Sequence, residues 1–219
     1  MHRACSESIS SPVIPLLLAH PGIDVNLKDN DGRSPFYLAC YGRPSCIREM
    51  LKDSRVKVNE PNDDGRTPLF WAVAASGQFD VIKGWIASGR EMDLGKRGDF
   101  YGTDAIGVAN WRGKTEVATL LERFKSDTAK TRQEVRLEIG WYDELAAEMF
   151  ALVVFVSDGL LQVKITKTAT PAARYFTIAS QLPLELQMVL CFRLAGLNKE
   201  IIPGKDSEVA FKEVARRLW

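Results

Sequence analysis

The stretch from Asp31 to Leu51 reads DGRSPFYLACYGRPSCIREML and occurs a second time in this chain. The second copy, from Asp64 to Ile86, reads DGRTPLFWAVAASGQFDVIKGWI, and its Gly65 follows Gly32 by 33 residues. Self-similarity at a period of this length is typical of small units that stack, because a single unit cannot bury its own hydrophobic face. The chain is therefore predicted to contain a repeat array.

Each copy opens with residues that suit a tight turn followed by a helix. Asp-Gly closes such a turn readily, because glycine accepts the positive φ that it requires. Ser34 and Thr67 follow at the position where a hydroxyl caps a helix by accepting a backbone N–H. Pro35 and Pro68 then take the first helical position, where a missing N–H has no consequence. Both copies are thus predicted to be a turn that leads into a helix.

Both copies resemble the ankyrin pattern D-G-x-T-P-L-x-x-A, in which the small residue corresponds to Ala39 and Ala72. The resemblance implies an all-α solenoid in which paired helices stack from repeat to repeat. It also implies that the repeats bind a partner protein along the turn tips and the adjoining inner helices.

Weaker copies lie on both sides of these two. Downstream, Asp104 stands at the capping position, and the stretch from Gly113 to Phe124 has the pattern of a second helix. Upstream, residues 2–5 align with residues 37–40, so the first repeat is expected to be truncated or frayed. His2 then holds an ankyrin position for which the resemblance implies a hydrogen bond to the backbone. About four repeats over residues 1–126 are predicted.

The composition indicates an ordinary globular chain. Its 219 residues are 46% hydrophobic and carry a net charge of +1, which predicts no footprint for nucleic acid or an anionic membrane. No apolar run approaches the roughly 18 residues of a membrane span. The cysteines, at positions 5, 40, 46 and 191, are expected to be buried thiols of a cytoplasmic protein. The alternatives are a disulfide between Cys5 and Cys40, and a secreted effector whose signal has been removed.

Residues 127–219 are predicted to form a separate helical module. Periodic apolar residues indicate helices in this region, and Gly140 and Gly196 are expected to end two of them. A repeat array leaves an apolar face at its last repeat, here at Leu120, Leu121 and Phe124. We expect the C-terminal module to cover that face.

The segment Leu182-Pro183-Leu184-Glu185-Leu186 resembles the opening of an F-box, L-P-x-E-[LI]. The resemblance implies that Leu182, Pro183, Glu185 and Leu186 bind the adaptor subunit of a cullin-type ubiquitin ligase. The alternative is an ordinary helix with proline at its first position and its Leu, Met and Val residues facing the core.

No motif predicts catalysis, a cofactor or a metal site. Gly113-Lys114-Thr115 is similar to the end of a phosphate-binding loop, but Val108 stands where that loop requires glycine. The repeat register accounts for Gly113 as the turn between paired helices. The two histidines, His2 and His20, have no partner at metal-ligand spacing. The chain is therefore predicted not to be an enzyme.

The ankyrin resemblance places the partner-binding residues at the turn tips and on the inner helices. The tip positions are Asn30, Asp31, Arg33, Asp63, Asp64, Arg66, Phe100 and Tyr101, and the inner-helix positions are Tyr41, Ala74, Ala75 and Trp111. Arginine, tyrosine and tryptophan are frequent among the residues that dominate interfaces.

Two alternatives remain open for these residues. Arg33 and Arg66 either clasp carboxylates of the partner or pair with Asp31 and Asp64 of their own turns. Trp71 and Trp85 are expected in the core rather than at the interface. The function predicted is that of a protein-binding scaffold, and the alternative is a ubiquitin-ligase substrate receptor.

Overall fold

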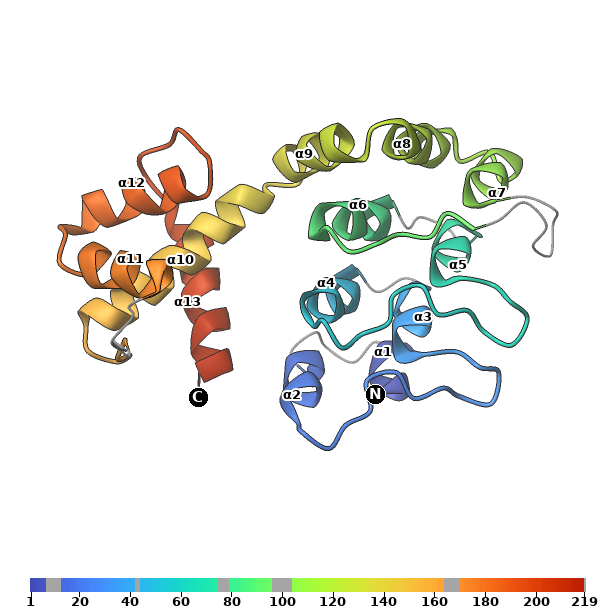
Figure 1. Cartoon of the computed structure of the whole chain (residues 1–219), viewed down its shortest axis with the longest axis horizontal. Helices are drawn as coiled ribbons and strands as arrows, with labels where there is room; N and C mark the ends of the chain where they lie inside the picture. Colours follow the sequence, from blue (N-terminus) through green and yellow to red (C-terminus); the bar gives the residue numbers. More distant parts are fainter. Residues whose placement is uncertain (7–12, 42–43, 75–78, 96–103, 164–169, 219) are drawn as a thin grey trace. The chain divides into compact units, whose positions relative to one another are not determined.

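The computed structural model describes residues 1–6, 13–41, 44–74, 79–95, 104–163 and 170–218 (Figure 1). These residues form thirteen helices and no strand, which confirms the all-α prediction. The chain divides into two compact units, residues 1–135 and residues 136–219. Among the described residues, no helix is both long enough and apolar enough to cross a membrane.

The first unit is a stack of four helix pairs. The pairs are α1 (His2–Ser6) with α2 (Val13–Ala19), α3 (Pro35–Ala39) with α4 (Pro44–Lys52), α5 (Pro68–Ala74) with α6 (Phe79–Ser88), and α7 (Ala105–Trp111) with α8 (Thr115–Ser126). The inner helices α1, α3, α5 and α7 pack in one row, and the outer helices α2, α4, α6 and α8 pack in another. This arrangement confirms the predicted solenoid, including its faint last repeat.

The residues predicted to cap the inner helices accept the expected backbone hydrogen bonds. Ser34 Oγ accepts from Tyr37 N at 3.1 Å, and Thr67 Oγ1 accepts from Phe70 N at 3.2 Å. Asp104 caps α7 in the same way, accepting from Gly107 N at 2.9 Å. The carboxylate thus replaces the hydroxyl of the stronger repeats.

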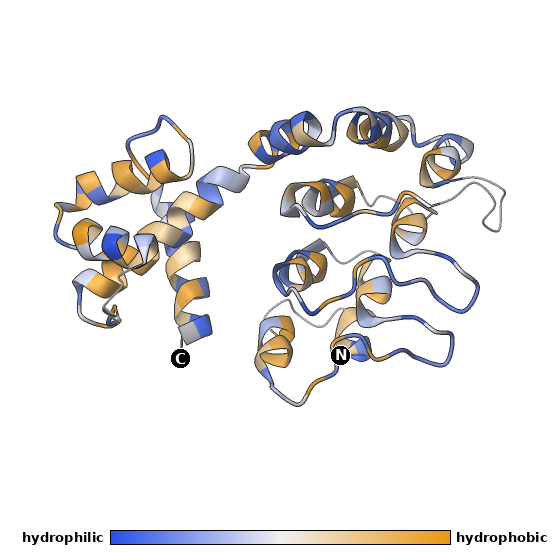
Figure 2. Ribbon diagram, in the orientation of Figure 1, coloured by the Kyte–Doolittle hydropathy of each residue, from blue (hydrophilic) through white to orange (hydrophobic). Residues whose placement is uncertain are grey.

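The interior of the stack is closely packed. Ala39 and Ala72 are fully buried, as close approach of neighbouring helices requires. Trp85 is also fully buried and meets Phe36 edge-on, with ring centroids 5.0 Å apart, which confirms its place in the core. Figure 2 shows hydrophobic residues along the helices and hydrophilic residues along the connecting turns. All four cysteines are buried free thiols.

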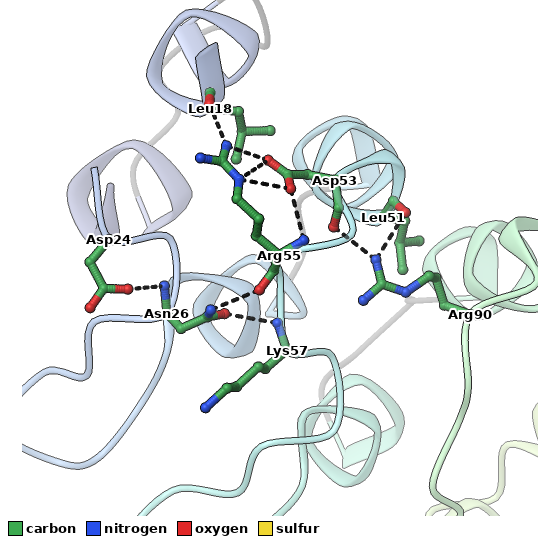
Figure 3. Close-up of polar contacts among 8 residues, drawn as sticks. All are labelled: Leu18, Asp24, Asn26, Leu51, Asp53, Arg55, Lys57 and Arg90. Atoms are coloured by element: carbon green, nitrogen blue, oxygen red, sulfur yellow. Dashed lines mark hydrogen bonds and ion pairs between the residues drawn. The ribbon is translucent and has the colours of Figure 1, made fainter. Parts of the chain in front are cut away.

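Three arginines share one role: each donates to a carbonyl oxygen near the C-terminus of an outer helix (Figure 3 shows two of them). The pairs are Arg55 with Leu18 (2.5 Å), Arg90 with Leu51 (3.4 Å) and Arg132 with Ile86 (3.2 Å). A cation there satisfies an acceptor that the helix leaves open and opposes the helix dipole. Each arginine comes from the element that follows in the stack, so the contact joins neighbours.

The last of these arginines lies on α9 (Thr128–Glu138), which is not part of a helix pair. Arg123 of α8 also forms an ion pair with Glu134 of α9, and Thr131 and Val135 are buried. These contacts join the beginning of α9 to the array. The first unit accordingly ends at Val135, whereas the sequence placed the end of the repeats at residue 126.

The second unit is built around one central helix. It contains α10 (Trp141–Ser157), α11 (Pro171–Ala179), α12 (Leu184–Leu194) and α13 (Gly204–Leu218). The other three helices all pack against α10. Their shared core includes Phe150, Val153, Cys191 and Phe192. The described residues of the second unit therefore share a single core.

Candidate functional site

Asp29 organises the first turn tip. Its carboxylate accepts from the backbone N–H of Asp31 at 3.0 Å and of Arg33 at 2.9 Å, and from Arg33 Nε at 2.9 Å. Partial burial acts to raise the pKa of Asp29, but these hydrogen bonds outweigh it and hold the pKa below its ordinary value. Sequence reasoning missed this residue, although Asn62 stands at the equivalent place one period later.

Asn62 organises the second tip in the same manner. Its Oδ1 accepts from Arg66 N at 2.9 Å, and its Nδ2 donates to Asp64 Oδ2 at 3.3 Å. An amide oxygen thus replaces the carboxylate oxygen of Asp29. The comparison shows that the turn needs a side-chain acceptor at this position rather than a negative charge.

The two tips are in direct contact with each other. Asp63 N donates to Asp31 O at 3.2 Å, and Lys28 Nζ donates to Pro61 O at 3.0 Å. Gly32 lies between them with φ of 71°, and a Cβ built on it would come within 2.7 Å of the backbone nitrogen of Asp63. Only glycine fits at position 32, because any side chain there would collide with the neighbouring tip. The two tips therefore lie directly against each other.

The two tip arginines lie beside carboxylates of their own turns, which favours the alternative in which they pair within the turn. Arg33 Nη2 lies 2.6 Å from Asp31 Oδ2, and the side chain of Arg33 is 39% exposed against 64% for that of Asp31. Arg66 Nη1 lies 3.9 Å from Asp64 Oδ2, and the side chain of Arg66 is 21% exposed against 62% for that of Asp64. The carboxylates are therefore more accessible than the guanidinium groups that accompany them.

Aromatic rings stack between the second and third repeats. Tyr41 is 63% exposed, and its ring lies 5.6 Å from that of Trp71 at an angle of 26°. Tyr37, which is buried, stacks on Trp71 as well, at 6.3 Å and 20°. Trp71 is only partly buried, so the prediction that it belongs to the core was wrong in part. It packs on core residues but remains accessible beside Tyr41.

Tyr37 joins this stack to the turn tips. Burial raises the pKa of Tyr37 to about 12, and the positive charges of Arg66 and Arg33 act in the opposite direction. Tyr37 connects the two groups, because its N–H donates to Ser34, directly after Arg33, and its ring stacks on Trp71.

Trp111 extends the aromatic series to the last repeat. It ends α7 at the register position of Tyr41 and Ala74, two residues after the small residue of each repeat. Trp111 is 65% exposed, and the guanidinium carbon of Arg112 lies 4.8 Å from the centre of its ring. We call Tyr41, Trp71 and Trp111 the aromatic surface.

Three of the predicted positions, Ala75, Phe100 and Tyr101, lie outside the described residues. Of the remaining tip residues, Asn30, Asp31, Asp63 and Asp64 are exposed. Ala74 is partly buried, and it holds in the third repeat the register position that Tyr41 and Trp111 hold in the second and fourth.

Two sequence features resemble other sites but have structural roles. Lys114 Nζ donates to Val73 O at 2.8 Å near the C-terminus of α5, and burial lowers the pKa of this lysine. Gly113 has φ of 69° in the turn that precedes α8.

His2 Nε2 lies 3.2 Å from Arg33 O, which confirms the expected hydrogen bond to the backbone. Among the described residues, no group of three His, Cys, Asp or Glu side chains is arranged to hold a metal ion.

The F-box-like segment lies at the start of α12 in the second unit. Pro183 precedes the helix as its N-cap, and Leu184, Glu185 and Leu186 are exposed, whereas Leu182 is partly buried. The buried positions of α12 are Gln187, Cys191 and Phe192. The alternative of an ordinary core-facing helix holds for Met188 and Leu190, which pack on the core, but not for Leu184 and Leu186.

Comparisons with known proteins agree with the fold. The family model for ankyrin repeats matches residues 1–97 in three copies. The SMC5-SMC6 complex localization factor protein 1 of Homo sapiens is 37% identical over 98 residues, as is that of Bos taurus, and the Mus musculus protein is 43% identical over 53 residues. The human and bovine matches cover 44% of this chain and only 9% of the relatives. Residues 1–97 are therefore ankyrin repeats, and the chain is an all-α ankyrin-repeat protein in this part.

Proposed function

We propose that this chain is a non-catalytic scaffold that binds another protein across its turn tips and inner helices. Ankyrin repeats act in protein–protein interaction, and this array exposes aromatic side chains, which often dominate interfaces. The observation that carries the proposal is the exposure of Tyr41 and Trp111 at the ends of the inner-helix segments, together with that of the tip carboxylates of Asp31 and Asp64. An intracellular location, which the buried free thiols favour, belongs to the same proposal.

The names of the relatives support a recruiting role. They are called localization factors of a protein complex, and such a factor must contact other proteins. The shared segment is less than a tenth of those proteins. We therefore carry over protein binding through the repeats, and not the identity of the complex.

A comparative pull-down tests the proposal. The full chain, the double variant Tyr41→Ala/Trp111→Ala and the control Leu16→Ala would be used to capture proteins, which are then identified by mass spectrometry. Leu16 is as exposed as the two aromatic residues but lies on the outer helix α2. We expect at least one partner to be retained by the control and lost by the double variant. The same set of proteins from all three would contradict the proposal.

The second candidate is a substrate receptor of a cullin-type ubiquitin ligase. The observation that favours it is the exposure of Pro183, Leu184, Glu185 and Leu186, because an adaptor can contact only residues that the core does not use. In this candidate the repeats bind the substrate and the second unit binds the adaptor.

The same pull-down distinguishes the second candidate when Leu186→Ala is added. Adaptor and cullin subunits should be captured by the unaltered chain and by the Tyr41→Ala/Trp111→Ala variant, but not by Leu186→Ala. Absence of both subunits from every sample would remove this candidate and leave the first unaffected.

A further inference from the structure

The aromatic surface also indicates what kind of partner segment it binds. Resting on the function proposed above, we infer that it takes an extended, basic segment of the partner protein. The lysine or arginine side chains of that segment lie over the exposed rings of Tyr41 and Trp111 and pair with the tip carboxylates.

The charge of the tips complements a basic segment. Residues 27–33 and 60–66 hold five carboxylates and three basic side chains, a net charge of −2. The exposed Lys28 donates to the carbonyl oxygen of Pro61. The carboxylates of Asp31 and Asp64 are more accessible than the guanidinium groups beside them, since their side chains are 64% and 62% exposed against 39% for Arg33 and 21% for Arg66. An approaching segment therefore meets negative charge first.

The aromatic rings favour cations as well. A cation above the face of tryptophan or tyrosine is attracted by the ring quadrupole. The chain already contains such pairs at its surface, with Arg112 over Trp111 at 4.8 Å and Lys83 over Phe79 at 4.2 Å. Tyr41 and Trp111 are both exposed enough to receive a side chain from another molecule.

The stacking of the repeats sets the spacing of those cations. Packed neighbouring helices lie about 8–10 Å apart. In the extended polyproline II conformation, residues i and i+3 share one face and are about 9 Å apart. A basic residue at every third position therefore keeps step with register positions 41, 74 and 111, which recur once in each repeat.

Peptide binding tests the inference. Three labelled peptides would be titrated with the full chain by fluorescence anisotropy: one with lysine at every third position, one with glutamate in its place, and one with the same lysines in a single block. We expect the spaced basic peptide to bind at least about ten-fold more tightly than the acidic one and several-fold more tightly than the blocked one. Its affinity should fall with added salt, because salt screens exposed charges.

Charge-neutral variants locate the effect on the chain. The isosteric double variant Asp63→Asn/Asp64→Asn should weaken binding of the spaced basic peptide about five-fold, since it removes two exposed charges. The control Glu116→Gln/Glu122→Gln removes two exposed carboxylates of the outer helix α8 and should leave the affinity unchanged. Melting temperatures of both variants show that they are folded, and the salt dependence of the unaltered chain gives an independent reading.

Equal or tighter binding of the acidic or the blocked peptide would overturn the inference, as would an unaltered affinity in Asp63→Asn/Asp64→Asn. Such a result leaves the function proposed above intact if Tyr41→Ala/Trp111→Ala still loses a captured protein. Failure of that pull-down, in contrast, removes the function on which the inference rests.

Discussion

The two units of this chain hold their helices together in different ways. In the first unit each repeat caps its own helix, and each neighbour adds the same few contacts, such as the arginine that reaches the end of the preceding outer helix. In the second unit one helix, α10, meets three others around a single core. Stability in a repeat array is roughly a sum of local terms, whereas a single small core melts as a whole. A substitution should therefore have a local effect in the first unit and a global effect in the second.

The largest effect is expected from Phe192→Ala. Phe192 is fully buried in the core of the second unit, and removal of a buried phenylalanine side chain costs about 3–5 kcal/mol. Calorimetry of the full chain should show two transitions, of which this substitution lowers only one. A single transition that shifts as a whole would show that the units melt together.

Gly32→Ala tests how closely neighbouring tips fit in the first unit. It combines a positive φ with a clash against the backbone of Asp63, and together these should cost about 3 kcal/mol. Gly65→Ala is the matched control, because Gly65 has φ of 78° but open space around it, so only about 1–2 kcal/mol is expected. Urea unfolding of both variants gives the two values, and equal values would disprove the close contact between the tips.

Removal of α9 tests where the array ends. The fragment of residues 1–139 keeps Thr131, Arg132 and Val135, and the fragment of residues 1–126 loses them. Because burial of a valine side chain alone contributes about 1.5–3 kcal/mol, the shorter fragment should be less stable by about 2 kcal/mol and more prone to aggregate. Equal melting temperatures would show that α9 is not a part of the repeat unit.

Local features of the fold could be predicted from the sequence, and long-range ones could not. Ser34, Thr67 and Asp104 were identified as caps because a cap depends on residues only three positions away. The partners of Arg90 and Arg132 lie more than thirty residues away and are backbone carbonyls, which leave no trace in sequence. The contacts of α9 with the array through Arg132 and Glu134 could not be predicted for the same reason.

The positions of the candidate residues could be predicted in part, and their role in binding stays a prediction. The period placed Trp111 correctly on an inner helix, where it ends α7, whereas Tyr41 lies two residues beyond the end of α3. The accessibility of Trp71 depends on how α5 is rotated against Tyr37 and Tyr41, and the exposure of Leu186 depends on the rotation of α12. A helical repeat of apolar residues does not determine either rotation when nearly all faces are apolar.

The smallest effect is expected from Asp29→Asn, which makes the first tip resemble the second. Asparagine can still accept from the backbone of Arg33, as Asn62 does from Arg66, so less than about 1 kcal/mol should be lost with the partly exposed ion pair. The pKa of Asp29 is lowered in the folded chain, so its contribution is complete above the unfolded value of 3.8 and disappears as pH falls through the lower folded value. Acid unfolding monitored by circular dichroism should thus be less steep in Asp29→Asn, and an identical acid transition would contradict the contribution of this carboxylate.

Site-specific photo-crosslinking tests most directly the claim that the repeats, and not the second unit, bind the partner protein. A photoreactive amino acid would be placed at Tyr41 on the inner face, at Leu186 in the second unit, and at Leu16 on the outer helix as a control; all three positions are exposed. We predict that the captured partner is crosslinked from position 41 and not from positions 16 or 186. Crosslinks from position 186 with none from position 41 would contradict the account and move the binding surface to the second unit.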